Sequence, residues 1–428
     1  MRELALDVLV VGAGPAGIAA TLAARDAGCS VGVVDGGAAP GGQIWRRDLA
    51  GGMPARAARM LAALDASGAQ RICGLVVDAA SPHRLFVESD GEVRSLRCGQ
   101  LILATGARER FLPFPGWTLP GVFGAGGLQA LVKGGFDIAG KHVVVAGSGP
   151  LLLAVAAFLQ ERGALVRCIA EQADFAAVAA VGARLVLHPS KASQWARIER
   201  RLMGVSRRYA TWPLRARGDR SVESVVLGGA AGELEIPCDA LACGFGLIPD
   251  TRLARLLGCA VSGAPAAVTV DAMMRTSCER VFACGEVVGV GGVDAALLEG
   301  QIAGLMVAGR VRPARSLVRR RRRERRLAAR IQAAFALRPE LRFLPRDDTI
   351  VCRCEDVVWS AVRDSDTIRN AKLKTRCGMG PCQGRVCAPA LEFLLGWPSD
   401  RVRSPLFPIS MRCVRAVGAV RDSASAGP

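Results

Sequence analysis

Five cysteines near the C-terminal end of the chain have the residue type and spacing to bind a metal centre: Cys352, Cys354, Cys377, Cys382 and Cys387. Thiolates are soft ligands that suit iron–sulfur clusters and zinc. A close pair, a spacer and the run CGMGPCQGRVC allow two chain segments to bind one inorganic centre. The glycines of that run favour a cluster, because exposed backbone N–H groups can hydrogen-bond inorganic sulfur. Structural zinc, which also binds four thiolates, remains the alternative.

The chain is poor in residues that could act as general acids or bases on a substrate. It contains only three histidines and one tyrosine: His83, His142, His188 and Tyr209. None of the histidines lies beside a plausible nucleophile in the sequence, so we assign no catalytic residue. This composition favours a chain that moves electrons over one that activates a substrate.

Residues 6–35 predict the elements that would position a dinucleotide: a strand, a glycine turn, a helix and a second strand. The first strand is an almost continuous apolar run, as in parallel strands buried on both faces. Gly12, Gly14 and Gly17 form the pattern GxGxxG, which permits the turn, the approach of a pyrophosphate and close packing of helix on strand. Phosphates would lie at the helix N-terminus, and Asp35 ends the second strand, where it could bind ribose hydroxyls.

Residues 141–171 predict a second unit of the same kind. Gly147 and Gly149 match the first two glycines, and Glu171 ends the following strand. Leu152 replaces the third glycine, and its bulk should force the helix away from the strand or tilt it. The second motif therefore leaves three occupants open: NAD(P), another adenine nucleotide, or none.

The net charge of +18 raises the question of an anionic partner. Nine arginines lie between Arg315 and Arg330, where Glu324 is the only acid. We interpret this run as a solvated linker or helix, with docking to an acidic partner or peripheral contact with a membrane as the alternative. No aromatic interleaving or nucleic-acid-binding motif accompanies it, so no nucleic acid partner is expected. The apolar N-terminal start lacks a basic region before it and a cleavage site after it, which predicts a cytoplasmic protein.

The succession GAGPAG, Asp35, GGQIWR, LATGARER, AGSGP and ACGE resembles the FAD/NAD(P)-dependent pyridine-nucleotide-disulfide oxidoreductase fold. The added runs VCRCEDV and TRCGMGPCQGRVC narrow this resemblance. Together they are similar to the α-type subunits of opine oxidases, of hydroxyproline and proline dehydrogenases and of hydrogen cyanide synthase. These subunits carry a C-terminal module similar to the bacterioferritin-associated ferredoxin (BFD). No cysteine pair opens a helix after the first glycine unit, so disulfide reductase chemistry is not expected.

The resemblance implies an α/β fold with two nested Rossmann-like dinucleotide-binding domains and a small BFD-like [2Fe–2S] domain. The domains implied are residues 1–120 with 265–310 for FAD, 121–264 for the NAD(P)-like domain, 311–345 for an Arg-rich linker, 346–405 for the cluster and 406–428 for a tail. The end of that tail, DSASAGP, has the composition of a disordered segment.

The resemblance also implies which residues bind the cofactors. FAD would be bound by Gly12, Gly14, Gly17, Asp35, Gly42, Gln43, Thr105, Gly106, Gly285 and Glu286. Glu286 stands where the wider fold usually has an aspartate near the flavin's ribityl or phosphate region. The cluster ligands would be Cys352, Cys354, Cys382 and Cys387, with Cys377 as an extra thiol.

The partner implied by the resemblance is a β-type flavoprotein subunit similar to D-amino-acid oxidase, which oxidises a secondary amine or an amino acid. This chain would then receive electrons in a hetero-oligomer and pass them through FAD and the cluster to a downstream acceptor. A self-contained NAD(P)H-dependent reductase, with the nicotinamide nucleotide at the second glycine motif, is the alternative interpretation.

Overall fold

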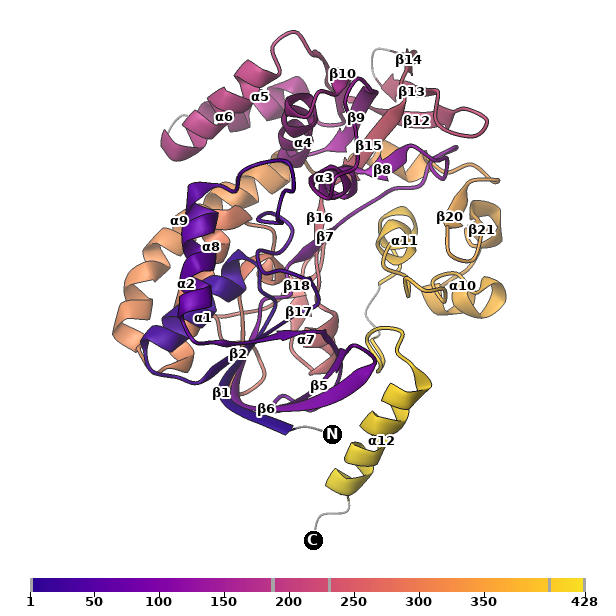
Figure 1. The fold of residues 1–428 in the computed structure, drawn as a ribbon. Helices are drawn as coiled ribbons and strands as arrows, with labels where there is room; N and C mark the ends of the chain where they lie inside the picture. Colours follow the sequence, from indigo (N-terminus) through magenta and orange to yellow (C-terminus); the bar gives the residue numbers. More distant parts are fainter. Residues whose placement is uncertain (1–2, 186–188, 230–231, 399–401, 426–428) are drawn as a thin grey trace. The chain divides into compact units, whose positions relative to one another are not determined.

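The computed structural model describes residues 3–185, 189–229, 232–398 and 402–425. The chain forms two compact units, each drawn in Figure 1. The first unit contains Met1–Arg108, Ile248–Ala328 and Asp400–Pro428, and the second contains Glu109–Leu247 and Ala329–Ser399.

A seven-stranded sheet organises the first unit, with the order β3-β2-β1-β6-β5-β4 and β19 paired with β6. These strands are β1 (Glu3–Val11), β2 (Val31–Asp35), β3 (Gln70–Cys73), β4 (Leu75–Ser81), β5 (Arg84–Ser89), β6 (Glu92–Leu103) and β19 (Val281–Ala283). The register pairs Val11 with Val34 and with Leu103, and Leu103 with Ala283. Because these four strands are parallel, their carboxyl ends meet at one edge of the sheet, where ligands bind in this class of fold.

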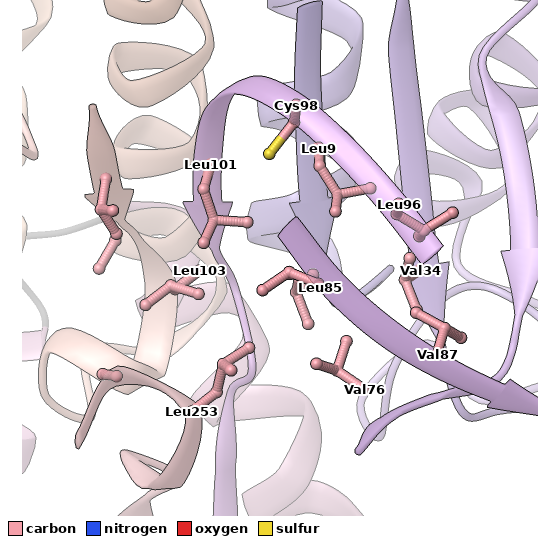
Figure 2. Packing of buried hydrophobic residues seen from close by; sticks show 14 of the residues in the cluster. Leu9, Val34, Val76, Leu85, Val87, Leu96, Cys98, Leu101, Leu103 and Leu253 are labelled. Carbon is pink, nitrogen blue, oxygen red and sulfur yellow. The ribbon is translucent and has the colours of Figure 1, made fainter. Parts of the chain in front are cut away.

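Helices cover the sheet of the first unit (Figure 1). They are α1 (Pro15–Asp26), α2 (Ala55–Ala66), α7 (Arg252–Leu256), η1 (Gly285–Val288), α8 (Gly292–Val307), the first part of α9 (Val311–Ala334) and α12 (Met411–Ser425); β17 (Val261–Ser262) and β18 (Ala267–Val268) form a small hairpin. Figure 2 shows one part of the core, where Leu9, Leu101 and Leu103 pack against side chains of neighbouring strands. The α8 helix approaches α1 closely, since a Cβ at Gly300 would lie 2.1 Å from the carbonyl oxygen of Ala16.

The second unit contains a five-stranded parallel sheet with the order β11-β10-β9-β15-β8. Its strands are β8 (Val122–Gly124), β9 (His142–Ser148), β10 (Leu165–Glu171), β11 (Ser206–Arg208) and β15 (Ala240–Phe245). It is completed by an antiparallel sheet of β12 (Thr211–Arg217), β13 (Ser224–Gly229) and β14 (Leu234–Pro237) and by the helices α3 (Ala125–Lys133), α4 (Pro150–Glu161), α5 (Phe175–Leu185) and α6 (Pro189–Arg201). The short strands β7 (Ala107–Glu109) and β16 (Leu247–Pro249) each include residues of both units.

The cysteine-rich segment belongs to the second unit in the structure. It contains η2 (Pro339–Phe343), β20 (Ile350–Cys352), β21 (Val357–Val358), η3 (Trp359–Ala361), α10 (Ile368–Thr375) and α11 (Cys387–Leu395). The indole Nε1 of Trp117 donates a hydrogen bond to the carbonyl oxygen of Ile350 at 2.5 Å. Leu341 and Ala390 share a buried cluster with Val144 of β9. The separate domain at 346–405 stays a prediction.

Two segments expected to be a linker and a tail contain long helices. The arginine run lies within α9, one continuous helix whose inward side chains include the buried Leu327 and Ala328. The α12 helix takes up most of the predicted tail, and its Cys413 is buried against Val77 and Phe86 of the first sheet. The expected disorder of DSASAGP stays a prediction: its first residues form the end of α12, and residues 426–428 lie outside the described part of the chain.

Candidate functional site

The turn between β1 and α1 brings three predicted glycines together. A Cβ at Gly17 would lie 1.8 Å from the carbonyl oxygen of Gly12, so only glycine lets the helix pack this closely on the strand end. At Gly14, by contrast, the nearest heavy atom outside its chain neighbours would be the Cα of Gly42, at 3.9 Å. A Cβ at Gly14 would therefore meet only an ordinary van der Waals contact, which leaves room at the N-terminus of α1, where N–H groups favour the pyrophosphate of a dinucleotide.

Asp35 lies at the end of β2, next to this turn. Its carboxylate accepts hydrogen bonds from the N–H of Ala13 at 2.6 Å and of Gly37 at 2.7 Å. A carboxylate has about four acceptor positions, so Asp35 can hold the turn and still bind ribose hydroxyls. The residues at this sheet edge thus fit an FAD, with room for the pyrophosphate and an acceptor for the ribose.

The other predicted FAD residues in the first unit surround the same turn. A Cβ at Gly12 would lie 3.4 Å from the backbone nitrogen of Thr105, and one at Gly285 would lie 2.6 Å from the Cβ of Ala16. The hydroxyl of Thr105 donates to the carbonyl oxygen of Asp250 at 2.7 Å, and the Asp250 N–H donates to the carbonyl oxygen of Gly106 at 2.9 Å.

Gln43 and Glu286 differ in their surroundings. The side-chain oxygen of Gln43 accepts a hydrogen bond from Arg46 at 3.1 Å, on an exposed part of the surface. Glu286 is half-buried, and burial raises its pKa, while a backbone hydrogen bond from Gly292 and the charge of Arg325 act in the opposite direction. The FAD assignment of all these residues stays a prediction.

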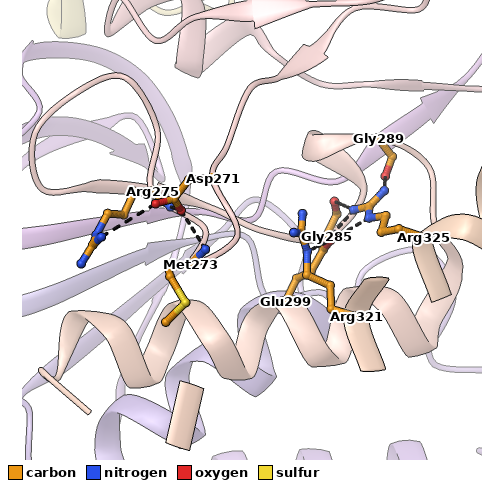
Figure 3. A network of polar contacts seen from close by, with 8 residues as sticks. All are labelled: Asp271, Met273, Arg275, Gly285, Gly289, Glu299, Arg321 and Arg325. Carbon is orange, nitrogen blue, oxygen red and sulfur yellow. Dashed lines mark hydrogen bonds and ion pairs between the residues drawn. The ribbon is translucent and has the colours of Figure 1, made fainter. Parts of the chain in front are cut away.

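Sequence reasoning missed an ion-pair network beside Gly285, which Figure 3 shows. Glu299 of α8 is fully buried and accepts hydrogen bonds from Arg321 and Arg325 of α9. Besides Asp294 in its first turn, the apolar helix GVDAALLEGQIAGLMV has an acid at its centre, Glu299. This was the available signal, because a carboxylate in such a stretch needs a buried cationic or hydrogen-bonding partner.

At the second glycine turn, the polar side chains form hydrogen bonds to other residues of the protein. The hydroxyl of Ser148 donates to the carbonyl oxygen of Phe335 at 3.0 Å. The amide of Gln172 donates to the carbonyl oxygen of Ala336 at 3.1 Å and accepts from the N–H of Arg338 at 3.1 Å. Residues 335–338 therefore lie at the carboxyl ends of β9 and β10, where the adenosine half of a dinucleotide binds in such folds.

Glu171 and Leu152 are also buried in this second unit. Glu171 is 7% exposed and accepts hydrogen bonds from the N–H groups of Gly149 and Ala173 at 2.8 and 2.9 Å. Burial raises the pKa of Glu171 to about 7, against the effect of those hydrogen bonds. Leu152 is 1% exposed and forms part of the core around Val145, so its bulk is absorbed by apolar packing.

Three of the five candidate cysteine ligands form a buried group in the described part of the chain. The Sγ atoms of Cys352, Cys377 and Cys387 all lie within 4.8 Å of one another. The hydrogen bond with Cys387, followed by burial, raises the pKa of Cys352. A bound metal ion would offset this rise in pKa, because it binds and stabilises the thiolate form of the cysteine. The N–H of Gly378, a glycine of the run CGMGPCQGRVC, donates to the Cys352 sulfur at 3.3 Å.

The remaining two cysteines contact each other. The Cys354 thiol accepts a hydrogen bond from the backbone of Cys382, which lowers the pKa of Cys354. Burial, the Cys382 thiol and the nearby Cys352 act in the opposite direction, and the pKa of Cys354 is raised overall. The contacts thus divide the five residues into a group containing Cys352, Cys377 and Cys387 and a pair, Cys354 with Cys382. Five thiols at one place fit an iron–sulfur cluster or zinc, and the assignment of four of them as ligands stays a prediction.

Comparison with known proteins identifies the family. The protein family described as pyridine nucleotide-disulphide oxidoreductase matches residues 6–309 of this chain. The chain belongs to this family. It is an FAD-dependent oxidoreductase, and the predicted fold class is confirmed. Among the described residues, no helix combines the length and the hydropathy needed to cross a membrane.

Two relatives match this family member along almost its whole length. The A subunit of opine oxidase from Rhizobium meliloti is 33% identical, with 95% of this chain and 97% of the relative covered. The hydrogen cyanide synthase subunit HcnB of Pseudomonas protegens is 31% identical, with 94% and 92% covered. These matches confirm the resemblance inferred from the motifs. The solved L-proline dehydrogenase from P. horikoshii shares the fold, with a TM-score of 0.67, 18% identity and 96% of this chain and 80% of that chain covered.

Gly14→Trp should abolish FAD binding without unfolding the protein, because the side chain would enter the space beside the turn. Flavin released on denaturation and the thermal unfolding temperature are the two measurements. Gly52→Trp is the matched control, since Gly52 belongs to the same unit and has nothing within 4 Å of an added Cβ. A normal flavin content in Gly14→Trp would place the pyrophosphate elsewhere.

NADH or NADPH should reduce the bound FAD slowly or not at all, because residues 335–338 lie over the second glycine turn. Stopped-flow absorbance of the flavin measures this rate. Gln172→Ala removes two hydrogen bonds to that segment and should increase nucleotide binding in a calorimetric titration, whereas the exposed Gln70→Ala should not. Fast bleaching of the wild-type flavin by either nucleotide would contradict the expectation.

Cys382→Ser and Cys387→Ser should each lose the cluster, whereas Cys377→Ser should keep it. A [2Fe–2S] cluster takes two thiolates at each of two irons, and a serine hydroxyl is a poorer ligand for such a soft site. Cys354 and Cys382 would bind one iron, so one thiol of the other group would be spare, and the family resemblance implies that this thiol is Cys377. Iron content and visible absorption are the measurements, with the exposed Cys73→Ser as control. Cluster loss in Cys377→Ser with retention in Cys382→Ser would reverse the assignment.

Proposed function

We propose that this chain is the electron-transfer subunit of a two-component dehydrogenase that oxidises an amine or an amino acid of the opine, proline or hydroxyproline type. The observation that carries the proposal is the match to HcnB and to its opine oxidase counterpart over 94% or more of this chain. Both relatives are named as subunits, and the match includes the cysteine-rich segment as well as the nucleotide-binding units.

Two carriers would serve this function. When bound, FAD supplies two-electron chemistry and a [2Fe–2S] cluster supplies one-electron transfer. The chain would bind the FAD pyrophosphate beside Gly14 and its ribose at Asp35, and it would hold the cluster through Cys352, Cys354, Cys382 and Cys387. The small number of histidines and the absence of an assigned general base agree with a role in which substrate activation takes place elsewhere.

The proposed partner is a β-type flavoprotein subunit similar to D-amino-acid oxidase, which would bind and oxidise the substrate. Electrons would then leave this chain for a downstream acceptor. The partner follows from the resemblance, and the subunit names of the relatives support an assembly of more than one kind of chain.

The alternative, a self-contained NAD(P)H-dependent reductase, requires an accessible second nucleotide site. The hydrogen bonds of Ser148 and Gln172 to residues 335–338 argue against it. Leu152, in place of the third motif glycine, argues in the same direction.

Protein prepared without oxygen should contain FAD and equal amounts of iron and acid-labile sulfide. Co-expression with a D-amino-acid-oxidase-like subunit should give a complex that reduces an artificial acceptor dye with an amine or amino-acid substrate, whereas this chain alone should not. Metal analysis, sulfide assay and dye reduction test the three parts. Zinc in place of iron would refute the cluster, and NAD(P)H-driven dye reduction by the isolated chain would support the alternative function.

A further inference from the structure

We infer that Arg325, held by the buried Glu299, is a positioning residue for the glycine turn at 285–289 that forms one wall of the proposed FAD site. This inference rests on the proposed binding of FAD in the first unit. The turn consists of η1 (Gly285–Val288) and Gly289, and it follows directly after the end of β19. All the residues involved belong to the first unit.

The ion pair reaches the backbone of the turn at both of its ends. The N–H of Gly285 donates to the Glu299 carboxylate at 3.1 Å. Arg325 donates to the carbonyl oxygen of Gly285 at 3.2 Å and to that of Gly289 at 2.6 Å. The two charged side chains therefore fix both polar groups of Gly285 and the carbonyl group that ends the turn (Figure 3).

The geometry of the guanidinium makes this arrangement specific to arginine. Its Nε and one terminal nitrogen donate to the two oxygens of Glu299 at 2.7 and 2.5 Å, while its terminal nitrogens also reach the two backbone carbonyl oxygens. A lysine ammonium is a point charge on a flexible chain and could not span these acceptors together. Arg321 donates to the same carboxylate at 2.9 Å, which leaves the backbone of the turn to Arg325.

The turn also fits closely around the arginine. A Cβ at Gly289 would lie 3.2 Å from a terminal nitrogen of Arg325, and one at Gly291 would lie 3.1 Å from the same atom. Gly285 and Gly289 have φ angles of +78° and +113°, which side chains rarely adopt. The turn therefore depends on glycine for its backbone path and on Arg325 for its anchoring.

Glu286, within the turn, is the residue that would face the cofactor according to the family resemblance. Burial raises the pKa of Glu286, and the backbone hydrogen bond from Gly292 and the charge of Arg325 oppose this shift. Arg325 would thus set the path of the backbone at the place where Glu286 meets FAD. Groups that orient the ligands of a metal ion typically change metal affinity or activity about 10- to 100-fold when removed, and by analogy we expect a loss of FAD affinity in that range.

The test compares single and double charge-neutral variants in the full chain. Arg325→Gln and Glu299→Gln should each weaken FAD binding about tenfold or more, measured by flavin fluorescence on dilution, and should shift the visible flavin spectrum. Arg325→Lys should rescue binding only in part. Arg326→Gln, a change at the exposed neighbouring position, should keep wild-type affinity and spectrum.

The double variant Glu299→Gln/Arg325→Gln separates positioning from stability. It removes the Arg325 charge that Glu299→Gln leaves without its carboxylate, while Arg321 loses that carboxylate in both variants. Its thermal unfolding temperature should therefore recover relative to Glu299→Gln. Its FAD affinity should stay low, because the carbonyl oxygens of Gly285 and Gly289 still lack their donor. Recovery of affinity together with stability, or wild-type affinity and spectrum in Arg325→Gln, would overturn the inference. A wild-type protein that binds no FAD would instead refute the proposed function, and this inference with it.

Discussion

The contact between the backbone of the β1–α1 turn and the helix that follows it is the constraint on which the first unit depends. Gly17 lies against the carbonyl oxygen of Gly12 at a distance that excludes any side chain. This contact fixes where α1 begins and which N–H groups point into the space at Gly14. The α8 helix then packs on α1 through Gly300, and α8 carries Glu299 to the turn at Gly285. The close approach of the α8 and α1 backbones thus determines where the buried carboxylate of Glu299 lies.

The second unit has the same strand and helix order but satisfies its polar groups differently. At the first turn, the partly exposed Asp35 keeps acceptor capacity that a ligand could use. At the second, Glu171 is buried, and Gln172 and Ser148 bind to residues 335–338. Buried polar groups need hydrogen-bond partners, and here the chain supplies them. The second unit therefore repeats the strand and helix order of the first without keeping these polar groups free for a nucleotide at its glycine turn.

The sequence predicted best what depends on local spacing. The GxGxxG turn, Asp35 at the end of its strand and the buried parallel strand before the turn follow from patterns within a few tens of residues. The network of Glu299 with Arg321 and Arg325 could not be predicted, because it depends on the packing of α9 on α8. An arginine run is typical of a solvated segment, but a helix places only part of such a run outward, and Arg321 and Arg325 lie on the inner face. Charge composition alone does not distinguish the two faces.

The chain path has a consequence for the order in which the protein can fold. The sheet of the second unit is built from residues 122–245, an uninterrupted stretch whose strands can pair once the ribosome has released it, before residues 335–390 complete its core. The first unit needs β19, α8 and α9, and it finally receives α12 from the end of the chain. Native contacts between segments so distant in sequence slow folding, because the long loops between them must first be closed. During synthesis, the N-terminal strands therefore expose part of their apolar surface until the segments after residue 280 have been made. In this state, binding to a chaperone would compete with aggregation.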